Sequence, residues 1–184
     1  MRLTRKNITR GLTEYRQVKE IYEEAFPESE RVWPWYLLLM SKRSSVDYVA
    51  YYDGDKLCGF TYSVVSDELV CVVYIAVKSE LRSKGYGSAI MDSLKEQYKG
   101  KIISLNVEEL DASADNFVQR KRRIDFYLKN DMIDTGYRIR KESGDFYIFS
   151  DSDKFTADMY RSSMYRYSFG TYMAPIYKKI VFDE

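Results

Sequence analysis

The segment Leu69 to Val77 constrains the fold of this chain more than any other part of the sequence. Its residues are all apolar or aromatic, a pattern typical of a strand that is covered on both faces in the middle of a sheet. Residues 86–98 follow with apolar side chains at helical spacing, and Lys101 to Val107 returns to a strand pattern. A strand, a helix and a second strand in succession form a crossover, so we expect these two strands to be parallel.

The other patterns place hairpins and helices around this crossover, and together they predict an α/β (α+β) fold with a mixed sheet and helices on its faces. The elements expected are an edge strand within Arg2–Arg10, a helix over Leu12–Phe26 with Thr13 as its N-cap, a short helix or loop over Trp33–Met40, a hairpin of Val46–Tyr52 and Leu57–Val65 around Asp53-Gly54-Asp55, an acidic loop over Glu108–Asp115, a helix over Asn116–Asn130, and a hairpin of Tyr137–Ile139 and Phe146–Phe149. The tail from Ser152 to Glu184, rich in Tyr, Phe and Met, shows no assignable element.

Composition excludes several classes of function. The 29 Lys and Arg residues balance 28 Asp and Glu residues, so no global charge would attract nucleic acid or a membrane surface. No window reaches the ~18 apolar residues of a membrane span, and the basic start of the chain has no apolar segment after it, so we expect a cytoplasmic protein. Cys58 and Cys71 lie in apolar runs and are expected to be buried, reduced thiols.

The chain has no histidine at all, which excludes Ser-His-Asp and Cys-His catalysis and histidine-ligated metals. We therefore expect no metal. The chemistry that remains uses positioning, backbone dipoles, carboxylates, lysine or tyrosine, and tyrosine is abundant, with 18 copies.

A glycine-containing loop, Leu81 to Ser88, joins the central strand to the next helix. Free backbone N–H groups and the helix dipole favour a phosphate at such a place, and Arg82 and Lys84 add positive charge. The spacing does not match a Walker loop, and a dinucleotide fingerprint would need a glycine where Ile90 stands. The alternative is that the loop is only a tight turn between a strand and a helix.

The residues of this loop resemble a known signature. Tyr74-Ile75-Ala76-Val77 followed by Arg82, Gly85 and Gly87 is similar to the coenzyme A motif of the GNAT family of N-acetyltransferases, which has Gln or Arg, two residues, Gly, one residue, and Gly or Ala. The flanking elements and Tyr127 on a later helix fit the same family, and the resemblance covers about Ile8 to Phe149.

The resemblance implies a mostly antiparallel sheet of about six to seven strands whose central parallel pair splays apart, with the pantetheine arm of coenzyme A in the gap. It implies direct attack of a bound amine on the thioester of acetyl-CoA, an oxyanion stabilised by a backbone N–H, and Tyr127 as the group that protonates the leaving thiolate. The cofactor-binding residues that it implies are Ile75, Ala76, Val77, Arg82, Ser83, Lys84, Gly85, Tyr86, Gly87 and Ser88.

The chain departs from the family pattern at several positions. Val73 occupies the place of the glutamate that many members use as a base, so our candidate base is Glu108, with a chain of water as the alternative. The Asn and Ala of the later helix are replaced by Arg120 and Arg123, and Asp131-Met132 replaces its final Gly-Phe. Asp131 is expected to adopt a left-handed conformation there.

Four residues or sets of residues have two interpretations each. Trp33, Trp35 and Tyr36 fit either a wall of the acceptor pocket or ordinary packing. The basic run from Arg120 to Arg123 fits contacts to the cofactor's 3′-phosphate or to nucleic acid, or a solvated helix face. Tyr127 is either a catalytic residue or an aromatic residue of the core, and Glu108 is either a catalytic residue or a solvated carboxylate of a loop.

The sequence thus predicts an acyl-CoA-dependent N-acyltransferase domain over residues 1–151 and an aromatic-rich extension over residues 152–184, packed on the same domain or at a dimer interface. The expected acceptor is an amine of a small molecule or peptide, with neither nucleic acid nor membrane as a partner and a homodimer left open. The alternative function is a non-catalytic acyl-CoA-binding sensor, favoured by the missing glutamate.

Overall fold

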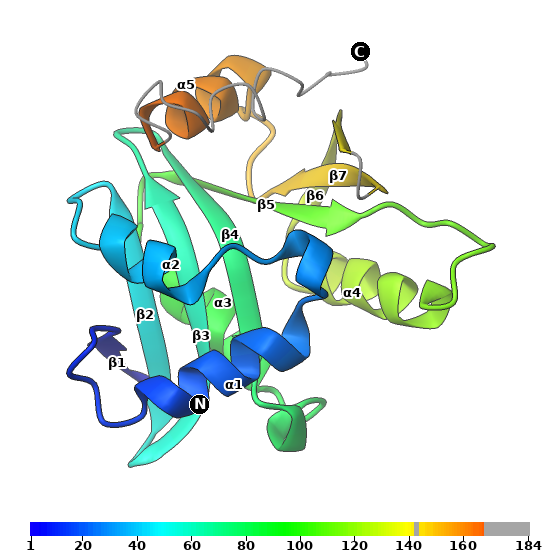
Figure 1. Ribbon diagram of the computed structural model, residues 1–184. Helices are drawn as coiled ribbons and strands as arrows, with labels where there is room; N and C mark the ends of the chain where they lie inside the picture. Colours follow the sequence, from blue (N-terminus) through cyan, green and yellow to red (C-terminus); the bar gives the residue numbers. More distant parts are fainter. Residues whose placement is uncertain (142–143, 168–184) are drawn as a thin grey trace. The chain divides into compact units, whose positions relative to one another are not determined.

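The computed structural model describes residues 1–141 and 144–167, which we use throughout (Figure 1). In these residues seven strands form a mixed sheet in the order β1-β2-β3-β4-β5-β7-β6, with β4 and β5 as its parallel pair. The predicted crossover is therefore confirmed. The chain groups into two compact units, one of Met1–Val65 with Val72–Lys99 and one of Ser66–Cys71 with the described residues from Gly100 onward. Strand β4 (Leu69–Val77) contributes to both units.

In the first unit, β1 (Thr4–Asn7), β2 (Val46–Asp53) and β3 (Lys56–Val65) form an antiparallel meander. The predicted edge strand and hairpin are confirmed, because β1 is an outer strand and Gly54, in the turn, has a left-handed φ of 59°. The helices of this unit are α1 (Tyr15–Ala25), α2 (Pro34–Met40) and α3 (Tyr86–Gln97), with short 3₁₀ turns at Glu28–Glu30 and Ser79–Leu81. In Figure 1, α1 and α2 lie on one face of β2 and β3, and α3 lies on the other.

The N-cap prediction for α1 is wrong. Glu14, not Thr13, is the N-cap residue, and no side chain caps the helix. The reason is a tight turn before the helix, in which the Tyr15 N–H donates to the Leu12 carbonyl at 3.0 Å. The Glu14 carboxylate in turn accepts a hydrogen bond from the Tyr52 hydroxyl at 3.1 Å, so it faces β2 and not the helix N–H groups.

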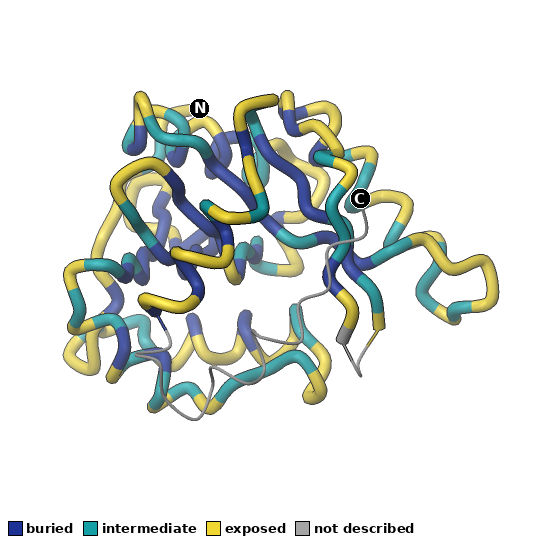
Figure 2. The backbone as a smooth tube through the Cα atoms, turned by 90° about the horizontal axis from the view of Figure 1, so that it is seen from above, coloured by how far each residue is buried: buried dark blue, intermediate teal, exposed yellow. Residues whose placement is uncertain are grey.

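An aromatic core holds α1 against the sheet of the first unit. Ring centroids in it lie 4.8 to 6.3 Å apart, mostly edge to face, a geometry that adds to simple area burial. In Figure 2 the buried residues lie mostly along the strands, whereas exposed residues lie in the connecting loops and along the helices. The rings that take part are Tyr22, Phe26, Tyr48, Phe60, Tyr62 and Tyr74.

In the second unit, β5 (Ile102–Glu108) pairs antiparallel with β7 (Gly144–Ser150), and β7 pairs antiparallel with β6 (Ile133–Lys141). Helix α4 (Phe117–Lys129) contacts β5 and has Asn130 as its C-cap residue, and the φ of 59° at the following Asp131 confirms the left-handed conformation expected there. The predicted final hairpin is confirmed, although Ser143 of its expected turn lies outside the described residues.

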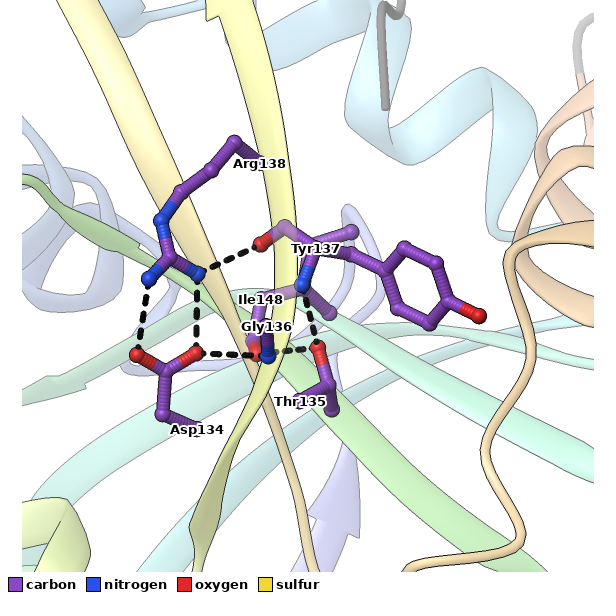
Figure 3. Close-up of polar contacts among 6 residues, drawn as sticks. All are labelled: Asp134, Thr135, Gly136, Tyr137, Arg138 and Ile148. Atoms are coloured by element: carbon purple, nitrogen blue, oxygen red, sulfur yellow. Dashed lines mark hydrogen bonds and ion pairs between the residues drawn. The ribbon is translucent and has the colours of Figure 1, made fainter. Parts of the chain in front are cut away.

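Strand β6 is longer than predicted, because its pairing with β7 continues on both sides of a bulge. The bulge lies between Asp134 and Arg138 (Figure 3). Gly136 has φ 81° there, its N–H donates to Asp134 Oδ1 at 2.9 Å, and the Arg138 guanidinium binds both oxygens of that carboxylate at 2.8 and 3.0 Å. The Thr135 hydroxyl donates to the Ile148 carbonyl at 2.8 Å. The irregular backbone therefore satisfies its polar groups locally, as bulges that serve a structural purpose do.

The first part of the C-terminal tail forms α5 (Ala157–Tyr167), which the sequence did not predict. It packs within the second unit: the Tyr160 hydroxyl accepts from Asn106 Nδ2 of β5 at 2.9 Å, and the Ser163 hydroxyl donates to that of Ser66 at 3.0 Å. Phe155, just before the helix, packs on Tyr137 beside the bulge. Residues 168–184 of the expected extension lie outside the described residues.

Candidate active site

The two faces of β4 are covered to different extents. Alternate side chains of a strand point to opposite faces, and the face of Val70, Val72, Tyr74 and Ala76 is buried along its whole length. The other face is buried at Leu69 and Cys71, but Val73 is 37% exposed and Ile75 and Val77 are half-buried. The expectation that β4 is buried on both faces is therefore wrong for its second half, because no described side chain covers that end of the strand completely.

The loop after β4 has the backbone shape of an anion site. Ser83 and Gly85 both have positive φ, 61° and 86°, and Gly85 is the N-cap residue of α3. For a serine this conformation is uncommon and strained, and such strain is often found at binding sites. The first N–H groups of a helix lack partners within it, so those of residues 85–88 point outward from the start of α3. Successive N–H groups of this kind form a concave site for a phosphate.

Arg82 is held close to this loop. Its Nε donates to the Val77 carbonyl at 3.3 Å, and its Nη2 lies 3.4 Å from the Glu24 carboxylate of α1, with both side chains half exposed. Lys84 is exposed and, in the described part of the chain, makes no ion pair. Tyr86 is anchored by its hydroxyl, which donates to Asp53 Oδ2 at 2.9 Å, and this hydrogen bond raises the Tyr86 pKa. The first unit therefore brings together the residues predicted to bind a diphosphate.

Two tyrosines make hydroxyl contacts near β4 that the sequence did not predict. The Tyr74 hydroxyl donates to the Glu30 carbonyl at 2.8 Å, and the Tyr22 hydroxyl accepts from the Val32 N–H at 2.9 Å. Both bonds hold the connection between α1 and α2 against the aromatic core. A tyrosine in an apolar run is the only signal of such an anchor, and it is not specific.

Gly59 of β3 allows β3 and β4 to approach closely. A Cβ at this position would lie 2.2 Å from the Ala76 carbonyl oxygen and 3.1 Å from Ile90 of α3. Only glycine fits there without displacing backbone. The position of the C-terminal end of β4 thus depends on a residue 17 positions earlier in the chain.

The predicted proton donor, Tyr127, lies in the second unit. It is buried on α4, with ring contacts to Phe126 at 5.0 Å and Phe149 at 6.5 Å. Burial raises the pKa of Tyr127 to about 12, and the positive charge of Arg123 acts in the opposite direction. Its hydroxyl makes no hydrogen bond to another described residue.

The predicted base, Glu108, also lies in the second unit, at the end of β5, where 9% of it is exposed. Arg123 forms an ion pair with its carboxylate, the Arg120 Nε lies 3.6 Å from it, and Asn116 donates to it at 3.3 Å. Arg120 also donates to the Glu109 carbonyl at 2.8 Å. Two members of the basic run thus bind the protein itself, which a fully solvated helix face would not do, and Glu108 is not a solvated loop carboxylate.

The described residues contain no group of three or more Cys, Asp or Glu side chains arranged to hold a metal ion. Both cysteines are free and buried, as predicted. No helix within the described ranges is long and apolar enough to cross a membrane.

The fold is a mixed sheet with a central parallel pair, in which the first strand of that pair is followed by a loop with the backbone shape of an anion site and by a helix. The family model described as "Acetyltransferase (GNAT) family" matches residues 15–123, and the chain belongs to this family. The resemblance noted in the sequence is therefore confirmed, together with the GNAT-like fold.

Solved structures share this fold at low sequence identity. A GNAT-family protein from Bacteroides thetaiotaomicron has a TM-score of 0.72 at 23% identity, with 93% of this chain and 98% of that chain covered. An aminoglycoside 6′-N-acetyltransferase in complex with coenzyme A has a TM-score of 0.63 at 16% identity over 80% and 95% of the two chains. The ribosomal-protein-S18-alanine N-acetyltransferase from Escherichia coli has a TM-score of 0.55 at 18% identity over 80% and 92%. No curated protein sequence matches the chain.

Proposed function

We propose that this protein is an acetyl-CoA-dependent N-acyltransferase that transfers an acetyl or similar acyl group to a primary amine of a small molecule or peptide. The observation that supports the proposal best is the anion site of the first unit, where outward N–H groups at the start of α3 lie beside Arg82 and Lys84. A structural neighbour with this fold is described in complex with coenzyme A.

The cofactor would occupy the loop and the incompletely covered face of β4. The diphosphate would accept hydrogen bonds from the N–H groups at the start of α3, and the pantetheine arm would pair with backbone groups of Ile75 and Val77. That assignment explains why a strand so apolar ends with one face uncovered. The residues proposed to bind the cofactor are Ile75, Ala76, Val77, Arg82, Ser83, Lys84, Gly85, Tyr86, Gly87 and Ser88.

The reaction proposed is direct transfer. The nitrogen of the amine attacks the thioester carbonyl carbon, the carbon–sulfur bond breaks, and the departing thiolate takes a proton from the Tyr127 hydroxyl while the nitrogen loses one to a base. Glu108 remains the candidate base. Its ion pairs with Arg120 and Arg123 suit a role in orienting other groups at least as well as a role as the base. The alternative is that a chain of water takes the proton from the nitrogen. No metal is part of this proposal.

The acceptor is proposed to be an amine because the names of two structural neighbours give aminoglycoside and ribosomal-protein-alanine acceptors. The alternative is a non-catalytic acyl-CoA sensor, which the valine in place of the usual strand glutamate favours, since Val73 cannot accept a proton.

The test is release of free thiol from acetyl-CoA across a panel of small amines and peptides. We expect at least one amine to release coenzyme A at a rate that saturates with acetyl-CoA, and acetyl-CoA to raise the melting temperature. The matched variant is Gly87→Glu, which places a negative charge in the first turn of α3 and should abolish both effects while the protein stays folded.

Stabilisation by acetyl-CoA without thiol release for any amine would favour the sensor. Equal stabilisation by ATP, or an unchanged response of Gly87→Glu, would contradict the assignment of coenzyme A to this loop.

A further inference from the structure

A second concave surface of the first unit contains Trp33 and Trp35, for which the sequence left open a wall of the acceptor pocket or ordinary packing. It is an open groove of about 1170 Å³ between the β1–α1 connection, α1, α2 and the α2–β2 connection. Its lining includes Arg10, Lys19, Trp33, Trp35, Leu39 and Lys42, and we call it the tryptophan groove. Neither the phosphate loop nor any residue of β4 lines it.

The apolar part of the tryptophan groove is unusually exposed. Trp33 and Trp35 are the only two tryptophans of the chain, and 74% and 61% of them, respectively, are exposed. Leu39, on the same helix as Trp35, is 51% exposed, whereas Leu37 and Met40 form the buried side of α2. Large exposed apolar side chains that gather in one place mark interaction surfaces, and tryptophan is among the residues that contribute most to binding energy.

The charged part of the groove has an excess of positive charge. Lys19 and Glu23 form an ion pair with each other at 3.6 Å. The Asp47 carboxylate is already engaged by the Tyr98 hydroxyl and, at 3.1 Å, by the Gln97 amide. Arg10 and Lys42 form no ion pair with any described residue. The groove can therefore accept negative charge without first breaking an internal ion pair.

We propose that the tryptophan groove binds a short acidic peptide segment that carries a large apolar side chain, supplied by a partner protein. The indoles and Leu39 would hold the apolar side chain, and Arg10 and Lys42 would pair with the acidic ones. Such complementarity gives specificity and speeds association.

Other occupants fit less well. A second copy of the groove would bring the same positive charges together in a symmetric contact, which costs energy. A small molecule would be mostly enclosed by its site, whereas these indoles stand largely in solvent. A membrane surface is flat, and this surface is hollowed.

The test uses tryptophan emission, because both tryptophans of the chain lie in the groove. The probe is an N-acetylated, C-amidated peptide of about nine residues that contains glutamates, one leucine and one phenylalanine. The peptide has no amine, so its binding does not depend on acyl transfer. A failure of the peptide-binding proposal can therefore be distinguished from a failure of the proposed acyltransferase function. The full chain should bind it with a Kd of about 10–100 µM, with a shift in emission, and more weakly as salt rises.

The variants are Trp33→Ala, in which the emission of Trp35 reports binding, and Lys42→Glu. Each should weaken binding of the peptide at least about fivefold. Both residues are exposed, so the fold should persist. The matched controls are Leu128→Ala and Lys129→Glu on α4, exposed residues of the other unit, which should change nothing.

Absence of binding, equal binding of a lysine version of the probe, or unchanged affinity in Trp33→Ala would overturn the proposal. So would a shift in tryptophan emission with vesicles of anionic phospholipid but not with the peptide, since the surface would then bind a membrane.

Discussion

Tyr127 combines a buried ring with a hydroxyl that has no hydrogen-bond partner in the described residues. That hydroxyl is not one of the fully buried polar atoms that lack a partner, so it retains access to solvent, which suits a group that acts on a ligand. Its pKa of about 12 lies roughly 3.5 units above the ~8.5 of a thiol, so full proton transfer would be uphill by about 5 kcal/mol. We therefore expect Tyr127 to stabilise the departing sulfur by a hydrogen bond, with transfer completed only as negative charge develops there.

Tyr127→Phe removes only the hydroxyl and should test this role. We expect kcat to fall about tenfold to a hundredfold, at the low end of general-acid effects because of the unfavourable pKa match, with a near-constant KM for acetyl-CoA. Steady-state rates under conditions where chemistry limits turnover would measure it, with Tyr165→Phe on the exposed side of α5 as the control. Retention of more than about half of the wild-type kcat would assign Tyr127 to the core instead.

At this scale, the sequence predicted the left-handed conformation of Asp131 but not the N-cap of α1, where a tight turn replaces the expected Thr13 cap. The spacing of Arg82, Gly85 and Gly87 is a local property, and so is the left-handed Asp131. The partners of Arg82 and Glu108 could not be predicted, because ion pairs between distant segments leave no periodic signal.

Among the elements, those with a clear period were predicted within a few residues, and β4 was predicted to its exact ends. The bulge of β6 was missed because it depends on Gly136 and on the pairing of Asp134 with Arg138, which fits a loop equally well. Helix α5 was missed although its buried residues Tyr160, Ser163, Met164 and Tyr167 recur at helical spacing, because one of the four is a serine and the apolar period is therefore incomplete. The uncovered half of β4 could not be predicted, since exposure depends on what packs against a strand.

Gly59→Ala tests how the close approach of β3 and β4 supports the proposed site. A methyl group 2.2 Å from the Ala76 carbonyl oxygen must displace the end of β4, so we expect a loss of stability of about 1–3 kcal/mol and a weaker affinity for acetyl-CoA. Denaturant unfolding and calorimetric titration would measure the two effects. Gly11→Ala is the matched control, because its nearest contact would be Thr9 Oγ1 at 3.9 Å. If both variants behaved alike, β4 would be free to adjust, and its position would not depend on Gly59.

In the whole molecule, burial of tyrosine is the most widespread electrostatic feature. Burial raises the pKa of Tyr48 and Tyr51 in the first unit and of Tyr127 in the second, and for Tyr98 the hydrogen bond to Asp47 adds to the effect of burial. Cys71 follows the same rule, with burial raising its pKa to about 12. Both units thus keep these groups in their neutral form.

This feature predicts a loss of stability at alkaline pH. In the unfolded chain tyrosines ionise near the ordinary value of 10.0, whereas in the fold Tyr127 stays neutral up to about 12, so the unfolded state loses protons first. Stability is therefore fully present below pH 10.0 and is lost progressively as pH rises toward about 12. Denaturant unfolding at several pH values would show it, with tyrosinate absorbance as the check on ionisation. Tyr127→Phe removes one such group and should lose less stability than the wild type between pH about 9.5 and 11.5, by up to about 2 kcal/mol. An identical alkaline loss in Tyr127→Phe and the wild type would mean that Tyr127 ionises as easily in the fold as in the unfolded chain, and would contradict its burial as the cause of its raised pKa.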